Sequence, residues 1–202
     1  MSTHFIDEIE GSVGWIESER MQRTSHALSV DGRVWLIDPI DGDGVEERIR
    51  GAGEPAGVIQ LLDRHGRDST AWAKRLGVPL HVVPHTLPGT PFELLPIVGN
   101  RWWKEVALLW PERRTLVCAD ALGTISFFRA GDEPAGLHPL LRFRRPRALA
   151  GLGVEHLLVG HGEGIHGEAA AAAVDRALRT GRRRIPRWLA QLPQLLRTAS
   201  PD

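Results

Sequence analysis

The stretch VIQLLDRHGRD, residues 58–68, passes abruptly from apolar side chains to charged side chains and a histidine. Two later stretches repeat this pattern: TLVCAD, residues 115–120, and HLLVGHG, residues 156–162. A short run of leucine and β-branched residues that ends in a loop is typical of a buried strand. In layered α/β folds, the loops after such strands bring together side chains that are distant in sequence. The sequence therefore predicts a functional site where these three strands end.

The rest of the chain predicts an α+β fold in which helices cover sheets. Residues 26–30 and 33–38 flank Asp31-Gly32, a dipeptide that two-residue hairpin turns favour. We expect further strands at 58–62, 80–83, 106–110, 115–118, 125–128 and 156–159, and helices at 45–50, 69–76, 137–150 (interrupted by two prolines) and 167–180. Residues 84–103, rich in proline and glycine, predict irregular structure. We expect one domain over residues 1–180 and a basic, helical C-terminal tail over 181–202.

Composition limits the class of protein. The 202 residues are enough for one domain with a buried core. Lysine plus arginine and aspartate plus glutamate are both 25, so net charge does not favour a polyanionic partner. The single cysteine, Cys118, lies in an apolar run and predicts a small core residue in a reducing compartment. The first residues lack a secretory pattern and no run approaches about 18 apolar residues, so we expect a cytoplasmic protein without a membrane segment.

The landmarks of this chain resemble, in order and spacing, the metallo-β-lactamase-fold superfamily, which includes glyoxalase II and many other hydrolases. They are a hairpin that ends in Ile37-Asp38-Pro39, a histidine-containing loop followed by a helix over 62–76, the segment CADAL at 118–122 and the segment LVGHGE at 158–163. The resemblance covers residues 24–180. It implies a four-layer αββα sandwich with the site at one edge of the two sheets.

The resemblance also assigns residues to the family's main loop, His-x-His-x-Asp-His, which holds two metal ions. Asp63 takes the place of the first histidine, and His65 matches the second. Arg67 falls where the family has its aspartate, and Asp68 falls on the last histidine. This chain therefore departs from the family's pattern at three of the four ligand positions in the loop.

Three further family ligands follow the main loop. A histidine in the family's Gly-His pattern maps onto Asn100, the bridging carboxylate matches Asp120, and the final histidine matches His161. The resemblance thus implies these candidate metal ligands: Asp63, His65, Asp68, Asp120 and His161. From the residues alone, Asp63 and Asp68 could equally form an ion pair and a helix N-cap.

Arg67 limits the number of metal ions. Its guanidinium stays protonated at any biological pH. At about 4 Å from a divalent ion it would cost roughly 8 kcal/mol at an effective dielectric constant near 20. We therefore expect either no metal or one divalent metal, namely zinc, iron or manganese. We expect Arg67 to turn away from the centre or to pair with Asp68 or Asp120.

Two functions remain open, and a third is less favoured. The first is a protein with a degenerate site that binds a small ligand or a partner. The alternative is an active mononuclear hydrolase of an ester, thioester, amide or phosphoester, with Asp120 and Arg67 as its candidate catalytic residues. A nucleic-acid processing factor is disfavoured, because the basic runs at 142–147 and 182–184 accompany zero net charge and no nucleic-acid motif.

The pair Trp102-Trp103 beside Arg101 predicts a substrate-binding edge or a partner surface. The alternative is that at least one of the two rings covers the edge of the core. No Gly-x-Ser-x-Gly segment occurs, which argues against a serine hydrolase. A homodimer is expected only from the general frequency of such assemblies.

Overall fold

The hairpin predicted from Asp31-Gly32 forms the centre of the first sheet. In the computed structural model, which describes residues 2–197, β3 (Thr24–Val30) and β4 (Arg33–Ile37) pair antiparallel. Asp31 and Gly32 both have positive φ angles, 50° and 75°, as a type I′ turn requires. This turn sets the register in which the apolar side chains of both strands face the interior.

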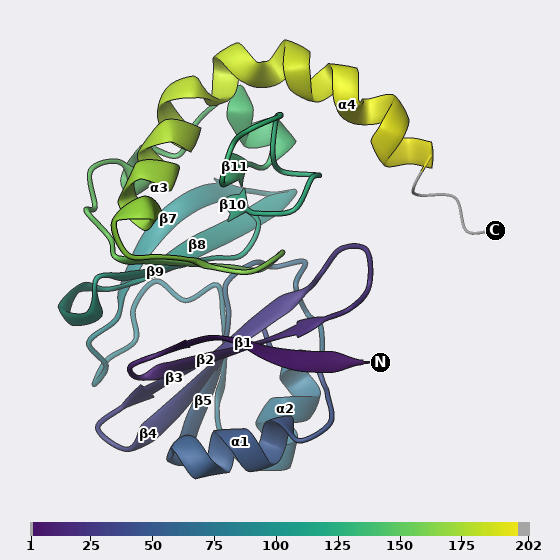
Figure 1. Ribbon diagram of the computed structural model, residues 1–202. Coiled ribbons are helices and arrows are strands. Elements are labelled where there is room, and N and C mark those ends of the chain that lie inside the picture. Colours follow the sequence, from purple (N-terminus) through teal and green to yellow (C-terminus); the bar gives the residue numbers. More distant parts are fainter. Residues whose placement is uncertain (1, 198–202) are drawn as a thin grey trace.

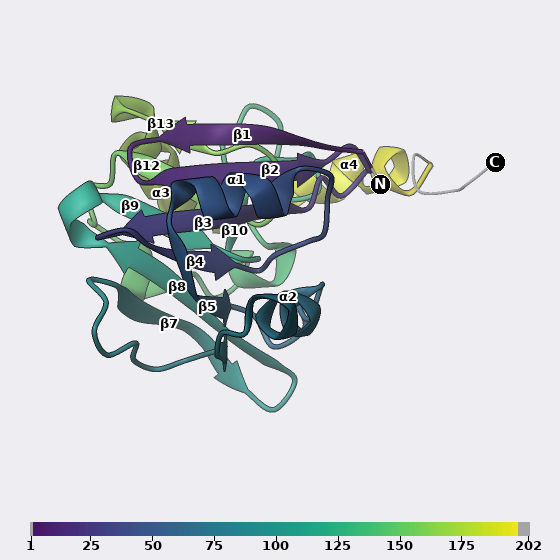
Figure 2. The same cartoon turned by 90° about the horizontal axis from the view of Figure 1, so that it is seen from below.

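Four strands extend the hairpin into a six-stranded sheet of order β1-β2-β3-β4-β5-β6. The added strands are β1 (Thr3–Ile9), β2 (Ser12–Glu17), β5 (Glu54–Gln60) and β6 (Leu80–Val82). The first four strands are antiparallel, whereas β4, β5 and β6 run parallel. Parallel strands need crossovers, and α1 (Val45–Ala52) and α2 (Ser69–Leu76) supply them. Both helices bury an apolar face on the outer side of this sheet (Figure 1; Figure 2).

The second sheet has the order β13-β12-β9-β8-β7. Its strands are β7 (Glu93–Asn100), β8 (Trp103–Trp110), β9 (Thr115–Cys118), β12 (His156–Val159) and β13 (Ile165–His166). The helix α3 (Glu168–Thr180) covers its outer face through alanines, Val174 and Leu178, which are buried. The strands β10 (Leu122–Gly123) and β11 (Gly136–Leu137) pair antiparallel and form a separate two-stranded sheet.

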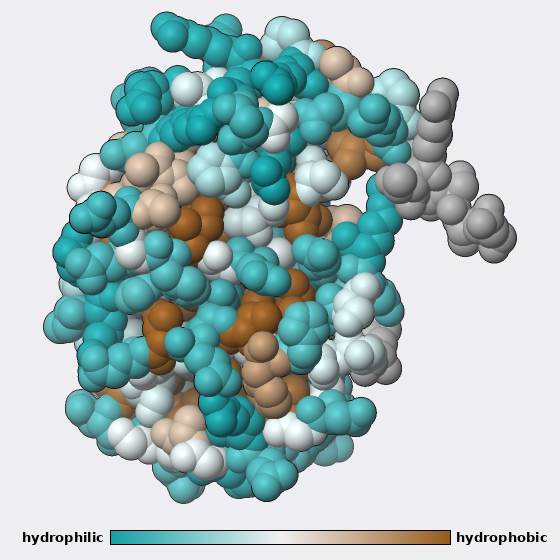
Figure 3. Space-filling model, in the orientation of Figure 1, coloured by the Kyte–Doolittle hydropathy of each residue, from teal (hydrophilic) through white to brown (hydrophobic). Residues whose placement is uncertain are grey.

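The two sheets pack face to face, so the layers run helix, sheet, sheet, helix (Figure 1). The main core fills the space between them and includes Leu28, Ile59, Leu108 and Leu116, each fully buried. The four-layer αββα sandwich implied by the sequence is confirmed. Hydrophilic residues cover most of the face seen in Figure 3, with apolar residues in smaller patches between them.

Several local predictions were wrong. Residues 125–128 form no strand, because Phe128 N–H bonds back to the carbonyl of Ile125 in a turn. The helix expected at 137–150 is replaced by two 3₁₀ helices, Pro139–Arg142 and Arg147–Leu149, since a proline lies at or just before the start of each. The irregular region expected at 84–103 contains β7, and the hairpin of β1 and β2 was not predicted.

The C-terminal segment begins with a 3₁₀ helix, Gly181–Arg184, and continues as α4 (Ile185–Arg197). The indole of Trp188 donates to the carbonyl of Phe127 at 2.7 Å, so α4 is tied to the main body. The rest of the predicted basic tail, residues 198–202, lies outside the described residues. Within residues 2–197, no helix has both the length and the apolar character needed to cross a bilayer.

Candidate metal centre

Three side chains converge where strands of both sheets end. His65 lies in the loop between β5 and α2, while Asp120 and His161 each follow a strand of the second sheet by two residues. The strands β9 and β12 are parallel neighbours, with Cys118 opposite Val159, so Asp120 and His161 leave the sheet side by side. The sequence prediction that these strand ends meet is therefore correct for all three residues.

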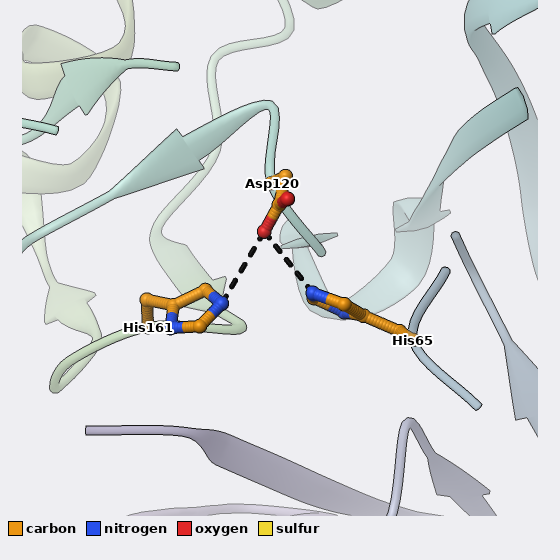
Figure 4. A group of neighbouring side chains, drawn as sticks. All are labelled: His65, Asp120 and His161. Carbon is orange, nitrogen blue, oxygen red and sulfur yellow. Dashed lines mark ion pairs between the residues drawn. The ribbon is translucent and has the colours of Figure 1, made fainter. Parts of the chain in front are cut away.

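The three side chains point toward one another (Figure 4). Oδ1 of Asp120 lies 3.1 Å from Nε2 of His65 and 3.3 Å from Nε2 of His161. One ligand atom from each residue falls within 4.8 Å of the others, the only such group of three or more potential ligands among the described residues. The side chains are largely buried, with 8–16% of their surface exposed.

The other ring nitrogen of each histidine already has an acceptor. Nδ1 of His65 lies 3.3 Å from Oδ2 of Asp38, and Nδ1 of His161 lies 2.8 Å from the carbonyl oxygen of Met21. An acceptor at Nδ1 holds the proton on that nitrogen, which leaves the lone pair on Nε2. Both lone pairs are therefore directed at the Asp120 carboxylate, as in metal sites whose histidines are oriented by outer hydrogen bonds.

This donor set fits one divalent cation. Oδ1 of Asp120 is buried and has no hydrogen bond of acceptable geometry, although two imidazole nitrogens lie close to it. Two nitrogen lone pairs and a carboxylate oxygen that face one point repel one another unless a proton or a cation lies between them. Two histidines and one carboxylate are a ligand set that zinc and iron(II) accept, with the remaining positions open to water.

Without a metal, protons take over part of this role. Burial and Arg67 act to lower the pKa of His65, but the carboxylates of Asp120 and Asp38 outweigh them and raise it. Burial acts to raise the pKa of Asp120, yet His161 and His65 outweigh burial and lower it strongly. In the metal-free protein Asp120 and His65 therefore stabilise each other's charged form.

Arg67 lies next to this centre but does not pair directly with Asp68 or Asp120, so the predicted pairing with these carboxylates was wrong. Its guanidinium donates to three carbonyl oxygens, those of Thr24 (2.6 Å), Asp38 (3.0 Å) and Gly160 (2.9 Å). Its backbone φ of 39° is in the left-handed region, which is strained for a residue other than glycine. Burial acts to lower its pKa, and Asp38 and Asp120 act in the opposite direction.

Two acidic residues support the centre, and the sequence analysis assigned neither of them a role. Asp38 accepts the backbone N–H of Leu61 through Oδ1 while Oδ2 faces His65. Glu105, fully buried in β8, accepts the backbone N–H groups of Asp120 (2.9 Å) and Ala121 (2.7 Å). The sequence signal for Glu105 was its position directly before the apolar run 106–110 of β8.

The remaining candidate ligands have other partners. Asp63 exchanges hydrogen bonds with the backbone of Lys104, donating its N–H and accepting through Oδ2. Asp68 is the N-cap residue of α2, and its Oδ2 accepts the backbone N–H of Asp41. The structure therefore brings together three of the five candidate ligands and places these two carboxylates in backbone contacts. Asn100 accepts the N–H groups of the two residues that follow Arg101, within a turn.

The two tryptophans have different environments. Trp103 is 6% exposed and donates its indole N–H to Oε2 of Glu105 at 2.9 Å. Its ring also contacts His138 and lies beneath the guanidinium of Arg64. Trp102 is 71% exposed and stacks with Arg101. Trp103 is thus the ring that covers the core edge, and Trp102 remains available to a ligand or a partner.

No protein-family model matches the chain, and no curated protein matches it either. Solved structures do match it. The chain is similar to DIM-1 metallo-β-lactamase exposed to ceftazidime, with 14% identity, a TM-score of 0.64 and coverage of 89% of this chain and 98% of that chain. The chain is also similar to a metallo-β-lactamase from Pontibacter korlensis, with 12% identity and a TM-score of 0.61; the match covers 88% of this chain and 99% of that chain.

A further similar structure is the metallo-β-lactamase FIM-1 from Pseudomonas aeruginosa in its mono-zinc form. Its identity to this chain is 9%, its TM-score is 0.56, and the match covers 92% of this chain and 98% of that chain. At these identities the likeness establishes the architecture of the chain and not its chemistry.

Proposed function

Because the chain has the metallo-β-lactamase fold, we propose that His65, Asp120 and His161 bind one divalent metal ion and that the protein is a mononuclear metal-dependent hydrolase. One observation carries this proposal. Both histidines have their Nδ1 occupied by an acceptor and present Nε2 to the same carboxylate oxygen. Histidines whose second ring nitrogen is held by an acceptor in this way are typical of metal sites.

Arg67 supports a single ion. The guanidinium lies close enough to Asp38 and Asp120 to influence and be influenced by their charges. A second divalent ion at this centre would therefore be repelled by a permanent positive charge. Arg67 also cannot readily turn out into solvent, because three carbonyl oxygens would each lose one donor.

The bound ion would supply a water molecule acidified to near-neutral pKa and would polarise the bond to be cleaved. Asp120 would orient that water and accept its proton, since its carboxylate lies at the meeting point of both histidines. Asp38 and the Met21 carbonyl would keep the histidines in the ligand tautomer. The substrates that suit this chemistry are esters, thioesters, amides and phosphoesters.

A second candidate is a metal-free protein that binds a small ligand or a partner at the same place. It is favoured by the fact that Asp120 already has two imidazoles as neighbours, so that a proton can balance the charge. The exposed Trp102 would then contribute to the binding surface.

Metal analysis distinguishes the two candidates. Protein purified without chelator or a metal-affinity tag should contain about one equivalent of zinc, iron or manganese, or take it up after dialysis against each ion. His65→Ala and Asp120→Asn should each remove this tightly bound equivalent, whereas His85→Ala, an exposed histidine elsewhere, should not. Hydrolysis of a chromogenic ester, a thioester or a phosphodiester should follow metal content. A protein that takes up no ion in any of these buffers is not a metallohydrolase.

A further inference from the structure

A second group of chemically capable side chains lies away from the candidate centre, where β13 pairs with β12. His156 and His166 are direct cross-strand partners in this antiparallel pair. Side chains directly opposite each other on such a pair share one face of the sheet. Here the two Nδ1 atoms face each other at 3.2 Å, with ring centroids 5.3 Å apart.

Asp7 of β1 determines which nitrogen of His166 carries the proton. Its Oδ1 lies 3.0 Å from Nε2 of His166. Its side chain is 4% exposed, and the backbone N–H of Gly164 donates to both carboxylate oxygens, at 2.9 and 3.1 Å. A carboxylate held in this way keeps the proton on Nε2, which leaves the lone pair of His166 on Nδ1, facing His156.

The spacing of the two nitrogens matches that of two ligands of one metal ion. Zinc–nitrogen bonds of 2.0–2.1 Å with tetrahedral angles place two imidazole nitrogens about 3.3 Å apart. The observed 3.2 Å is close to this spacing. The side chain of His166 is 34% exposed and His156 is partly exposed, so an ion and its water ligands can reach both nitrogens.

We propose that His156 and His166 form a separate metal-binding site for a first-row divalent ion such as Zn²⁺, with Asp7 as the carboxylate that positions His166. Without an ion, the same two nitrogens are joined by a hydrogen bond donated by His156; when an ion binds, this proton moves to Nε2 of His156 and frees its Nδ1 lone pair. Water molecules complete the coordination, so the affinity is moderate and follows the usual order, with Cu²⁺ bound more tightly than Zn²⁺. This site is independent of the function proposed for His65, Asp120 and His161.

The site has a structural consequence for the loop between the two strands. Residues 160–164 connect β12 to β13, and His161 projects from this loop. Asp7 already anchors the far end of the loop at Gly164. An ion held between His156 and His166 fastens the two strands on either side of it, so binding stabilises the folded protein in proportion to the logarithm of ion concentration.

Histidine-ring NMR spectra of the full chain, recorded during titration with Zn²⁺, test the proposal. These spectra distinguish Nδ1 from Nε2 coordination and report each histidine separately, so the His65 and His161 signals monitor the other centre. The expected result is Zn²⁺-dependent shifts of the Nδ1 signals of His156 and His166. These shifts should be lost in His156→Gln and in His166→Ala and retained in His85→Ala.

Asp7→Asn should weaken this binding by about 10- to 100-fold, because the orienting acceptor becomes a weaker one. The thermal transition midpoint should rise with Zn²⁺ in Asp120→Asn, which lacks the first centre, but not in the double variant Asp120→Asn/His156→Gln. Unchanged His156 and His166 signals at millimolar Zn²⁺ would overturn the proposal. So would a His166→Ala variant that binds as many equivalents, with the same affinity, as the wild type.

Discussion

The guanidinium of Arg67 donates to the carbonyl oxygen of Gly160 at 2.9 Å, immediately before the candidate ligand His161. The same side chain bonds to Thr24 in β3 and to Asp38 just after β4. One buried cation thus connects the ends of strands from both sheets at the position where they must meet for His65, Asp120 and His161 to converge.

Replacement of Arg67 by methionine should lower the free energy of unfolding by about 2–4 kcal/mol, because three carbonyl oxygens each lose a charged donor. Arg67→Lys should recover part of the loss, since an ammonium group can reach fewer of these acceptors at once. Denaturant unfolding of both variants measures the effect. Equal stability of Arg67→Met and the wild type would contradict the role given to these three hydrogen bonds.

Asp38→Asn should weaken metal binding by about 10- to 100-fold while it leaves the fold intact. The amide can still accept the N–H of Leu61, but it presents an NH₂ group to Nδ1 of His65. That donor forces the proton of His65 onto Nε2, where the metal would bind. Isothermal titration with Zn²⁺ checks this, with Asp41→Asn, an exposed carboxylate, as the control. An unchanged affinity for Zn²⁺ in Asp38→Asn would show that Asp38 does not set the tautomer of His65.

The buried carboxyl group of Glu105 should make the stability of the folded protein depend on pH. Burial, assisted by the charge of Asp120, raises the pKa of Glu105 from 4.5 to about 8. Between these two values the folded protein keeps a proton that the unfolded chain releases, so stability falls as pH rises through this window. Each pH unit should cost up to about 1.4 kcal/mol from this group.

The change in unfolding free energy from about pH 5 to about pH 8 should therefore be smaller in Glu105→Gln than in the wild type. Denaturant titrations at several pH values measure the difference, and groups that titrate in both proteins cancel. Parallel curves for the two proteins would show that Glu105 is ionised in the folded state throughout this range.

The first arginine of the basic run at 142–147 is a core residue. Arg142 is 1% exposed and donates to the fully buried Glu133 at 2.6 Å and to the carbonyl of Phe128. Arg142→Ala should lower the free energy of unfolding by about 3–5 kcal/mol, because Glu133 would remain buried without its partner. Arg144→Ala, an exposed arginine of the same run, should change it by less than about 0.5 kcal/mol. Similar losses in both variants would contradict this assignment.

The candidate ligands could be predicted from sequence because their signal is local. His65, Asp120 and His161 each follow a short apolar run, and the ends of such runs are readable without knowledge of the fold. The groups that orient them could not be predicted in the same way. The acceptor of His161 is the backbone carbonyl of Met21, and a backbone group leaves no trace in the sequence.

The errors in the predicted elements have related causes. Residues 125–128 have the composition of a strand, but Phe128 stacks on His161 and Phe127 packs on Trp188, so tertiary packing decides their conformation. The strand β7 contains Pro96 and lies at the edge of its sheet, where a missing N–H costs nothing, yet proline argued against a strand from sequence. The sequence singled out Arg67, but its three acceptors come from segments between 29 and 93 residues away.

The positive charge that joins the two sheets is the side chain of Arg67, so it is part of the protein and does not have to be taken up from the surroundings. Newly made chains should therefore fold completely in a zinc-depleted cell and remain folded there. Loss of the ion from the proposed metal centre would then stop the proposed activity reversibly, without exposing the chain to the proteases that remove unfolded proteins.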